Sequence, residues 1–144
     1  MKLKIDNETL IEDFFDRTRL FGIVAPVKDY VFSWYINQHL GYNFRINHSL
    51  EIQLKKKDRN YFCPIYEFAV SGCCMVHYLY NNQDDGEYLL PEFKHLDYLW
   101  LAKGETMEPQ EVQQLQQSLK FLPSVQLVTE MTNEKIKNKQ FLIF

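Results

Sequence analysis

The sequence predicts an α+β fold, with an antiparallel sheet of about five to seven strands, one buried helix and one surface helix. Short segments rich in β-branched and aromatic residues follow one another through the middle of the chain, separated by tight polar turns. Apolar residues recur at helical spacing in two longer segments on either side of this region. Because the 144 residues contain no linker or repeat, we expect a single domain over residues 1–144.

The first long helix is expected from Pro26 to Leu40, ending at Gly41. Proline suits the first turn of a helix, and glycine suits the left-handed conformation that often follows the last turn. The apolar residues of this helix cover more than one stripe, which predicts burial; they are Tyr30, Val31, Trp34, Ile36 and Leu40. The second helix, from Glu108 to Leu122, has one narrow apolar stripe, which is typical of a helix outside a sheet.

The other expected elements are a short helix after Asn7 and a series of strands. Pro64 cannot donate a backbone hydrogen bond, which predicts a sheet edge or a bulge at that position. The last four residues, 141–144, are all apolar, and we expect them to dock onto the domain as a strand or a plug. The strands are expected at residues 20–24, 50–54, 61–70, 73–80, 87–90, 98–102 and around 125–127.

Charge and cysteine content limit the classes of partner. The formal net charge of −3 argues against binding to nucleic acid or to anionic lipid, both of which favour a basic surface. No apolar run approaches the length of about 20 residues that crosses a membrane, and residues 1–6 lack the apolar stretch of a secretory signal. Cys63, Cys73 and Cys74 are too few and too close for a disulfide framework, so we expect buried, reduced thiols and a cytoplasmic protein.

Two patterns suggest ligands but have simpler explanations. Cys73, Met75 and His77 alternate, and their side chains suit a soft metal such as Cu(I). Three residues on one flat strand cannot surround an ion, so we expect ordinary core residues there, no metal and no cofactor. A basic run at residues 55–59 lies near aromatic residues, as in platforms for single-stranded nucleic acid. Its position at a hairpin favours a solvated turn instead.

The segment from residue 90 to residue 98 holds the densest group of polar side chains, in the order Leu-Pro-Glu-Phe-Lys-His-Leu-Asp-Tyr. Glu92, His95 and Asp97 are suited to roles as acid, base and orienting partner. A corner between two strands needs similar residues, because carboxylates there accept hydrogen bonds from free backbone N–H groups. No nucleophile accompanies the carboxylates, so the structural interpretation is favoured.

This segment resembles the signature of the IPExxxVDY family, a set of bacterial proteins. Pro91, Glu92, Asp97 and Tyr98 match the signature, while Leu90 and Leu96 stand where the family name has isoleucine and valine. The resemblance extends to four further parts of the chain, which are Leu20, Gly22 and Ile23, then Lys28, Asp29 and Tyr30, then Asn37, Leu40 and Gly41, and finally 141–144. It implies no activity, cofactor or partner.

Asp29 and Tyr30 form a pair like that of Asp97 and Tyr98, and one hypothesis places both pairs at a single polar site. The leading function prediction is a noncatalytic binding or adaptor module that acts through a sheet edge or an aromatic surface. The alternative is a small-molecule-binding domain or a weak acid/base enzyme centred on the corner from Pro91 to Tyr98. A deep pocket around Glu92 favours this alternative, and a convex corner favours the binding module.

Overall fold

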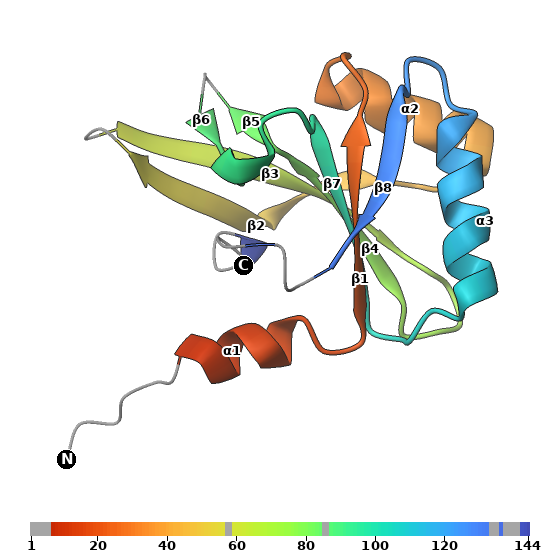
Figure 1. Cartoon of the computed structure of the whole chain (residues 1–144), viewed down its shortest axis with the longest axis horizontal. Helices are drawn as coiled ribbons and strands as arrows, with labels where there is room; N and C mark the ends of the chain where they lie inside the picture. The colour runs from red at the N-terminus through yellow and green to blue at the C-terminus, as the bar shows by residue number, and fades with distance from the viewer. Residues whose placement is uncertain (1–6, 57–58, 85–86, 133–135, 137–141) are drawn as a thin grey trace.

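The computed structural model describes residues 7–56, 59–84, 87–132, 136 and 142–144. Within them, the chain forms an antiparallel sheet in the order β2-β3-β4-β7-β1-β8, with helices packed against it, which confirms the α+β prediction (Figure 1). The strands of this sheet are β1 (Thr18–Val24), β2 (Arg45–Lys56), β3 (Arg59–Ala69), β4 (Val76–Asn81), β7 (Tyr98–Lys103) and β8 (Leu127–Met131). The remaining elements are α1 (Asn7–Phe14), α2 (Asp29–Leu40), α3 (Pro109–Lys120), a short 3₁₀ helix η1 (Pro91–Phe93), and the ribbon of β5 (Gln83–Asp84) and β6 (Glu87–Tyr88).

Both faces of the sheet are covered. Successive residues of a strand point to opposite faces, so β1 sends Phe21 to one buried cluster and Leu20 to the other. The cluster with Phe21 lies under α2 and α3, and we name this side the helix face (Figure 1). The cluster with Leu20 includes Leu90, Leu96 and Leu142, and we name this side the corner face.

The helix α2 differs from expectation at its start and in its burial. It begins at Asp29 rather than at Pro26, because the N–H of Val27 donates to the carbonyl of Ala25 at 2.7 Å in a tight turn and Lys28 is extended, with φ −68° and ψ 153°. It ends as predicted before Gly41, whose φ of 70° is left-handed. Tyr30 is 60% exposed and Trp34 is 57% exposed, so α2 is a surface helix and the prediction of a buried one is wrong.

Two predicted strands also need correction. The strand expected from residue 73 begins at Val76, because 71–74 form a turn in which Cys73 and Cys74 are exposed rather than buried. The strand expected at 87–90 is only the short β6, paired with β5 outside the main sheet. Pro64 pairs with Glu51 of β2 beside an irregularity in register, and the β3–β4 ladder begins one residue later. Because β3 lies between β2 and β4, the prediction of a sheet edge is wrong, whereas the irregularity in register agrees with the alternative of a bulge.

The end of the sequence docks as a plug on the corner face, which confirms the prediction for residues 142–144; Phe141 lies outside the described residues. The side chain of Leu142 is completely buried, and its carbonyl oxygen accepts a hydrogen bond of 2.9 Å from the Tyr80 hydroxyl. The ring of Phe144 meets the ring of Phe14 from α1 edge to face, with 5.2 Å between centroids. Residues far apart in the sequence therefore close this face together.

We predict that the close contact between Gly22 and Leu96 limits what residue 22 can be. A Cβ atom on Gly22 would lie 2.4 Å from Leu96 Cδ1, and Leu96 is only 1% exposed, so it has little room to move. Gly22→Ala should therefore lower the free energy of unfolding by about 1–3 kcal/mol, measured by urea denaturation. Leu96→Ala makes room for the new methyl group, so the double variant should lose less than the sum of the two single variants. Additive losses would contradict this account.

Candidate functional site

The corner between β6 and β7 is built around the buried side chain of Asn82. Its Nδ2 donates to the carbonyl oxygens of Phe93 at 3.0 Å and Leu96 at 2.9 Å, and its Oδ1 accepts from the N–H of Leu90 at 2.9 Å. Its own backbone N–H donates to the carbonyl of Asp97, at 3.0 Å. Asn82 is 0% exposed, and its bonds to Leu90 and Leu96 are buried, so these contacts replace water there. One amide therefore fixes the path of residues 90–97.

Asp97 and Tyr98 join this corner to the segment that leads into α2. The Asp97 carboxylate accepts a hydrogen bond of 2.8 Å from the N–H of Ala25, and the Asp97 N–H donates to Ile23 O at 2.8 Å. The Tyr98 hydroxyl donates to the carbonyl of Val27, and its ring stacks on Phe32 of α2 at 4.5 Å. These contacts hold residues 25–28 outside the helix, which is why α2 begins three residues later than its proline suggests.

A pocket of about 190 Å³ lies beside these contacts. Asp29, Asp97 and Tyr98 line it together, so three of the four residues in the two Asp-Tyr pairs lie around one site. The Asp29 carboxylate accepts a hydrogen bond of 2.8 Å from the hydroxyl of Tyr66 in β3. Burial raises the pKa of Tyr66, and Asp29 raises it further; burial also raises the pKa of Tyr98, with added contributions from Asp29 and Asp97. Both hydroxyls are therefore protonated donors at neutral pH.

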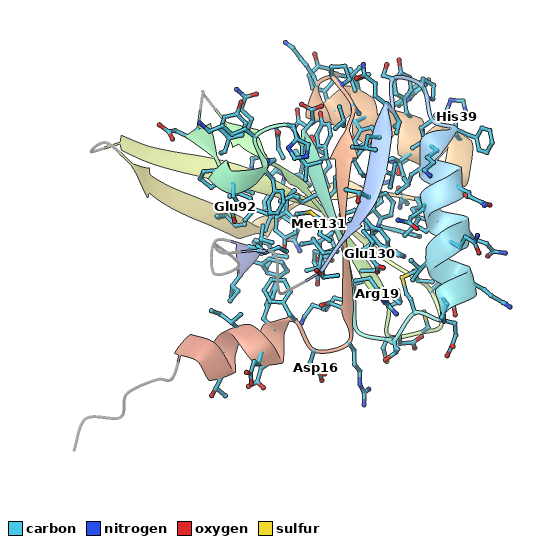
Figure 2. The ribbon with its side chains drawn as sticks, viewed as in Figure 1. Asp16, Arg19, His39, Glu92, Glu130 and Met131 are labelled. Atoms are coloured by element: carbon cyan, nitrogen blue, oxygen red, sulfur yellow. The ribbon has the colours of Figure 1, made fainter. Side chains whose placement is uncertain are left out.

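The other predicted site residues do not line this pocket. Tyr30 points to solvent from α2. Glu92 is half-buried at the start of η1 and lies on the side of the sheet near β5 and β6 (Figure 2). His95 is exposed, with its ring 6.3 Å from that of Phe93. The proposed acid, base and orienting partner are thus not assembled around the pocket.

A second pocket, of about 330 Å³, brings together Cys73, Met75 and His77. The Nε1–H of Trp100 donates to His77 Nδ1 at 3.0 Å, so a neutral imidazole carries its proton on Nε2. A nitrogen that carries a proton has no lone pair for a metal ion. This hydrogen bond therefore argues against His77 as a metal ligand, and no group of three or more His, Cys, Asp or Glu side chains in the described part of the chain is arranged to hold a metal.

Comparison with known proteins adds no family: no protein-family model, curated protein or solved structure matches this chain. No helix among the described residues is long and apolar enough to cross a membrane. The residues of the basic run at 55–59 have side chains outside the described part of the structure. The interpretation of the site therefore depends on its own geometry.

Sequence reasoning missed Asn82 as the central residue of the corner. It lies among Asn, Gln, Asp and Gly residues that are typical of an exposed loop. The sequence offers one signal: a strand ends before it and a proline-containing corner follows, and buried backbone groups at such a corner need a partner. It does not show which of the two neighbouring asparagines is the partner.

We predict that Asn82→Ala lowers the free energy of unfolding by about 2–4 kcal/mol, because it leaves two buried backbone groups, the N–H of Leu90 and the carbonyl of Leu96, without their partner. The matched control is Asn81→Ala. The Asn81 side chain accepts one exposed hydrogen bond, of 3.3 Å, from the N–H of Gln83, and its loss should cost less than about 1 kcal/mol. Urea denaturation measures both. Equal losses for the two variants would show that Asn82 does not hold the corner.

We also predict that His77 makes the protein less stable in acid. Burial lowers the pKa of His77 from 6.5 to about 4. The unfolded chain binds a proton near pH 6.5, whereas the folded chain does so only near pH 4, so acidification between these values favours unfolding. The stabilisation that buried, neutral His77 gives the folded state is fully present above pH 6.5. About 3 kcal/mol of the free energy of unfolding should be lost by pH 4.

The variant His77→Gln keeps an acceptor for Trp100 but has no imidazole to protonate. The loss of stability that His77 causes between pH 6.5 and pH 4 should therefore disappear in it. The variant retains the carboxylates of the parent, so the difference between the two unfolding curves isolates the histidine. Parallel curves between pH 6.5 and pH 4 would contradict the assignment.

Proposed function

We propose that the protein is a noncatalytic binding module that recognises a protein partner through the outer face of α2. The observation that carries this proposal is the exposure of Tyr30 and Trp34, 60% and 57%, one turn apart on the same helix. Residues four apart share one face of a helix, so the two rings form one surface, while Phe32 and Ile36 anchor the other side in the core. Trp and Tyr are the side chains most enriched at the centres of protein interfaces.

The rigidity of α2 supports this role. Asp97 and Tyr98 hold the segment before the helix, as described above. Near its other end, Asn37 exchanges two hydrogen bonds with the backbone of Phe44: its Nδ2 donates to Phe44 O at 3.1 Å, and its Oδ1 accepts from Phe44 N–H at 2.8 Å. A helix fixed at both ends loses little freedom on binding, which lowers the entropic cost of association.

The charge beside the aromatic surface indicates the chemistry of the partner. Asp29, next to Tyr30 in the sequence, and Asp97 line the pocket of about 190 Å³ at the start of α2 together with Lys28, so its lining carries more negative than positive charge. Each of these carboxylates has a second oxygen besides the one that accepts the hydrogen bond described above. We infer a partner segment with an apolar side chain for Tyr30 and Trp34 and an adjacent lysine or arginine for the pocket.

The enzyme alternative at the corner receives less support. The carboxylate of Asp97 and the hydroxyl of Tyr98 make hydrogen bonds with backbone groups, as structural residues do.

We also propose that the chain belongs to the IPExxxVDY family and acts in the cytoplasm. Cys63, Cys73 and Cys74 form no disulfide with one another, which supports a reducing compartment. The match of Pro91, Glu92, Asp97 and Tyr98 supports the family, and an alignment in which these positions vary freely would contradict it.

We predict that Tyr30→Ala/Trp34→Ala abolishes partner capture without unfolding the protein. A photo-crosslinking residue introduced at His39, at the far end of α2, reports partners bound along the helix in cells that naturally contain the protein. Loss of two central aromatic side chains should reduce the crosslinked partner at least about tenfold. The melting temperature should change little, because both side chains are mostly exposed.

Phe121→Ala is the matched control, because Phe121 is 89% exposed at the end of a different helix, α3. It should leave the crosslinked partner unchanged. Equal capture by the parent and the double variant, or equal loss in the Phe121 control, would contradict the proposed surface. Asp29→Asn should weaken capture of a basic partner severalfold and leave capture of a neutral one unchanged.

A further inference from the structure

The larger pocket, of about 330 Å³, is separate from the proposed protein-binding surface and shares no lining residue with the smaller one. Its walls come from the segments that follow α2 and β3, from the turn before β4 and β4 itself, and from α3 with the segment before it. Its volume falls within the range of small-molecule sites in proteins. We propose that this pocket binds a small arylalkylamine, with the ring inside the pocket and the ammonium group at its mouth.

The inner wall of the pocket is apolar and rich in sulfur, whereas polar side chains, among them Tyr42, Gln114 and Ser118, line the rest of it. Met75 is 7% exposed, and Met107 and Leu115 are each 6% exposed, so these side chains form its buried wall. Thioether groups pack favourably against the edges of aromatic rings. Along α3, residues that line the pocket are spread from Glu111 to Ser118, a span of eight residues or about 10 Å of helix, which gives room for one ring and a short chain. An aromatic body suits this interior.

A single buried donor lies among these apolar walls. His77 is 6% exposed and lines the pocket, and its Nδ1 is bound to the indole of Trp100, so Nε2 is the atom that offers a proton. The imidazole is held by stacking on the rings of Tyr42, at 5.5 Å, and Phe68, at 6.2 Å. Burial keeps the ring neutral at physiological pH, so it donates one hydrogen bond without adding positive charge. An oxygen on the ligand ring, such as a phenol, suits this donor.

The mouth of the pocket selects for positive charge. Among the described residues that line it, the charged side chains are Glu105 and Glu111, both exposed at the rim. Glu105 is positioned by a hydrogen bond of 3.0 Å from the N–H of Cys74 to its Oε1. Two carboxylates and a neutral imidazole repel an anion and attract an ammonium group. The combination of an apolar interior, one donor and an acidic rim therefore fits a cationic amine with an oxygen-bearing ring.

The test uses the full chain labelled with ¹⁵N and follows the indole N–H of Trp100, which is bound to His77. The probes are tyramine, its neutral counterpart 4-ethylphenol, and phenethylamine, which lacks the ring oxygen. Tyramine should shift the indole resonance saturably and bind at least about fivefold more tightly than 4-ethylphenol, because each rim carboxylate contributes modestly. Phenethylamine should bind several times more weakly than tyramine, because it leaves the His77 donor without a partner.

Glu105→Gln/Glu111→Gln should bring the affinities for tyramine and 4-ethylphenol within about twofold of each other. Both positions are exposed, so the double variant should fold. Glu108→Gln is the matched control, since Glu108 is exposed beside the same helix but does not line the pocket. It should keep the preference of the parent. Absence of a saturable shift with tyramine, equal affinity of the parent for 4-ethylphenol, or an unchanged preference in the double variant would overturn the proposal.

Discussion

The buried amide of Asn82 is the interaction on which the rest of the corner depends. It takes three backbone partners from residues 90, 93 and 96, and its own backbone binds Asp97 and Leu89. The N–H of Leu90 and the carbonyl of Leu96 are bonded in the buried interior, so without the amide the corner would have to open to solvent. Because residues 90–97 are held in one path, Leu96 can sit against Gly22 and Asp97 can reach Ala25.

The corner connects the two faces of the sheet. Leu96 fills the corner face over β1, where only a glycine leaves it enough room. The next two residues act at the helix face, since Asp97 binds the segment before α2 and Tyr98 stacks on Phe32 within that helix. Leu96 and Asp97 precede β7, which begins at Tyr98, so the bend of the corner rather than strand alternation sends Leu96 and Tyr98 to opposite faces. A short motif at the start of β7 therefore braces both layers at once. The motif residues Asp97 and Tyr98 therefore have a structural explanation that requires no chemistry.

Sequence reasoning succeeded where the determining pattern is local. The period of α3, the glycine that ends α2 and the apolar residues at 142–144 can each be read within a few neighbouring positions. The start of α2 could not be predicted, because Asp97 and Tyr98 determine it from 72 and 71 residues away. The exposure of Cys73 and Cys74 and the burial of Asn82 likewise depend on the strand order. Local composition does not contain that information.

At the candidate site, the sequence placed Asp29, Asp97 and Tyr98 in one group, and they line one pocket. The predicted group also included Glu92 and His95. These residues are close to Asp97 in the sequence, but they do not line the pocket that Asp97 lines. The corner turns the chain between residues 92 and 97, so neighbours in sequence face different surroundings. Chemical type and proximity in sequence therefore overestimate how many polar side chains converge.

Arg19 and Glu130 show how the edge of the sheet is closed near α3. Their side chains meet at 3.0 Å between β1 and β8 (Figure 2), and each remains about one-third exposed, so the pair contributes little to stability. It does satisfy the charged groups beside the edge strand, as neighbouring charges commonly do at sheet edges. On α2, by contrast, the exposed side chains Tyr30 and Trp34 are not part of the buried core cluster. Phe32 and Ile36, on the opposite side of the helix, belong to that cluster.

The two proposed binding regions can be tested independently because they are built on different rigid elements. Tyr30 and Trp34 lie on α2, whereas the amine pocket uses the side of α3 that carries Glu111 and Leu115. Neither aromatic residue lines that pocket, and neither rim carboxylate lies on α2. Variants on one region should therefore leave the other unchanged, since distant sites without shared partners behave additively. A loss at both regions from either set of variants would point to unfolding rather than to binding.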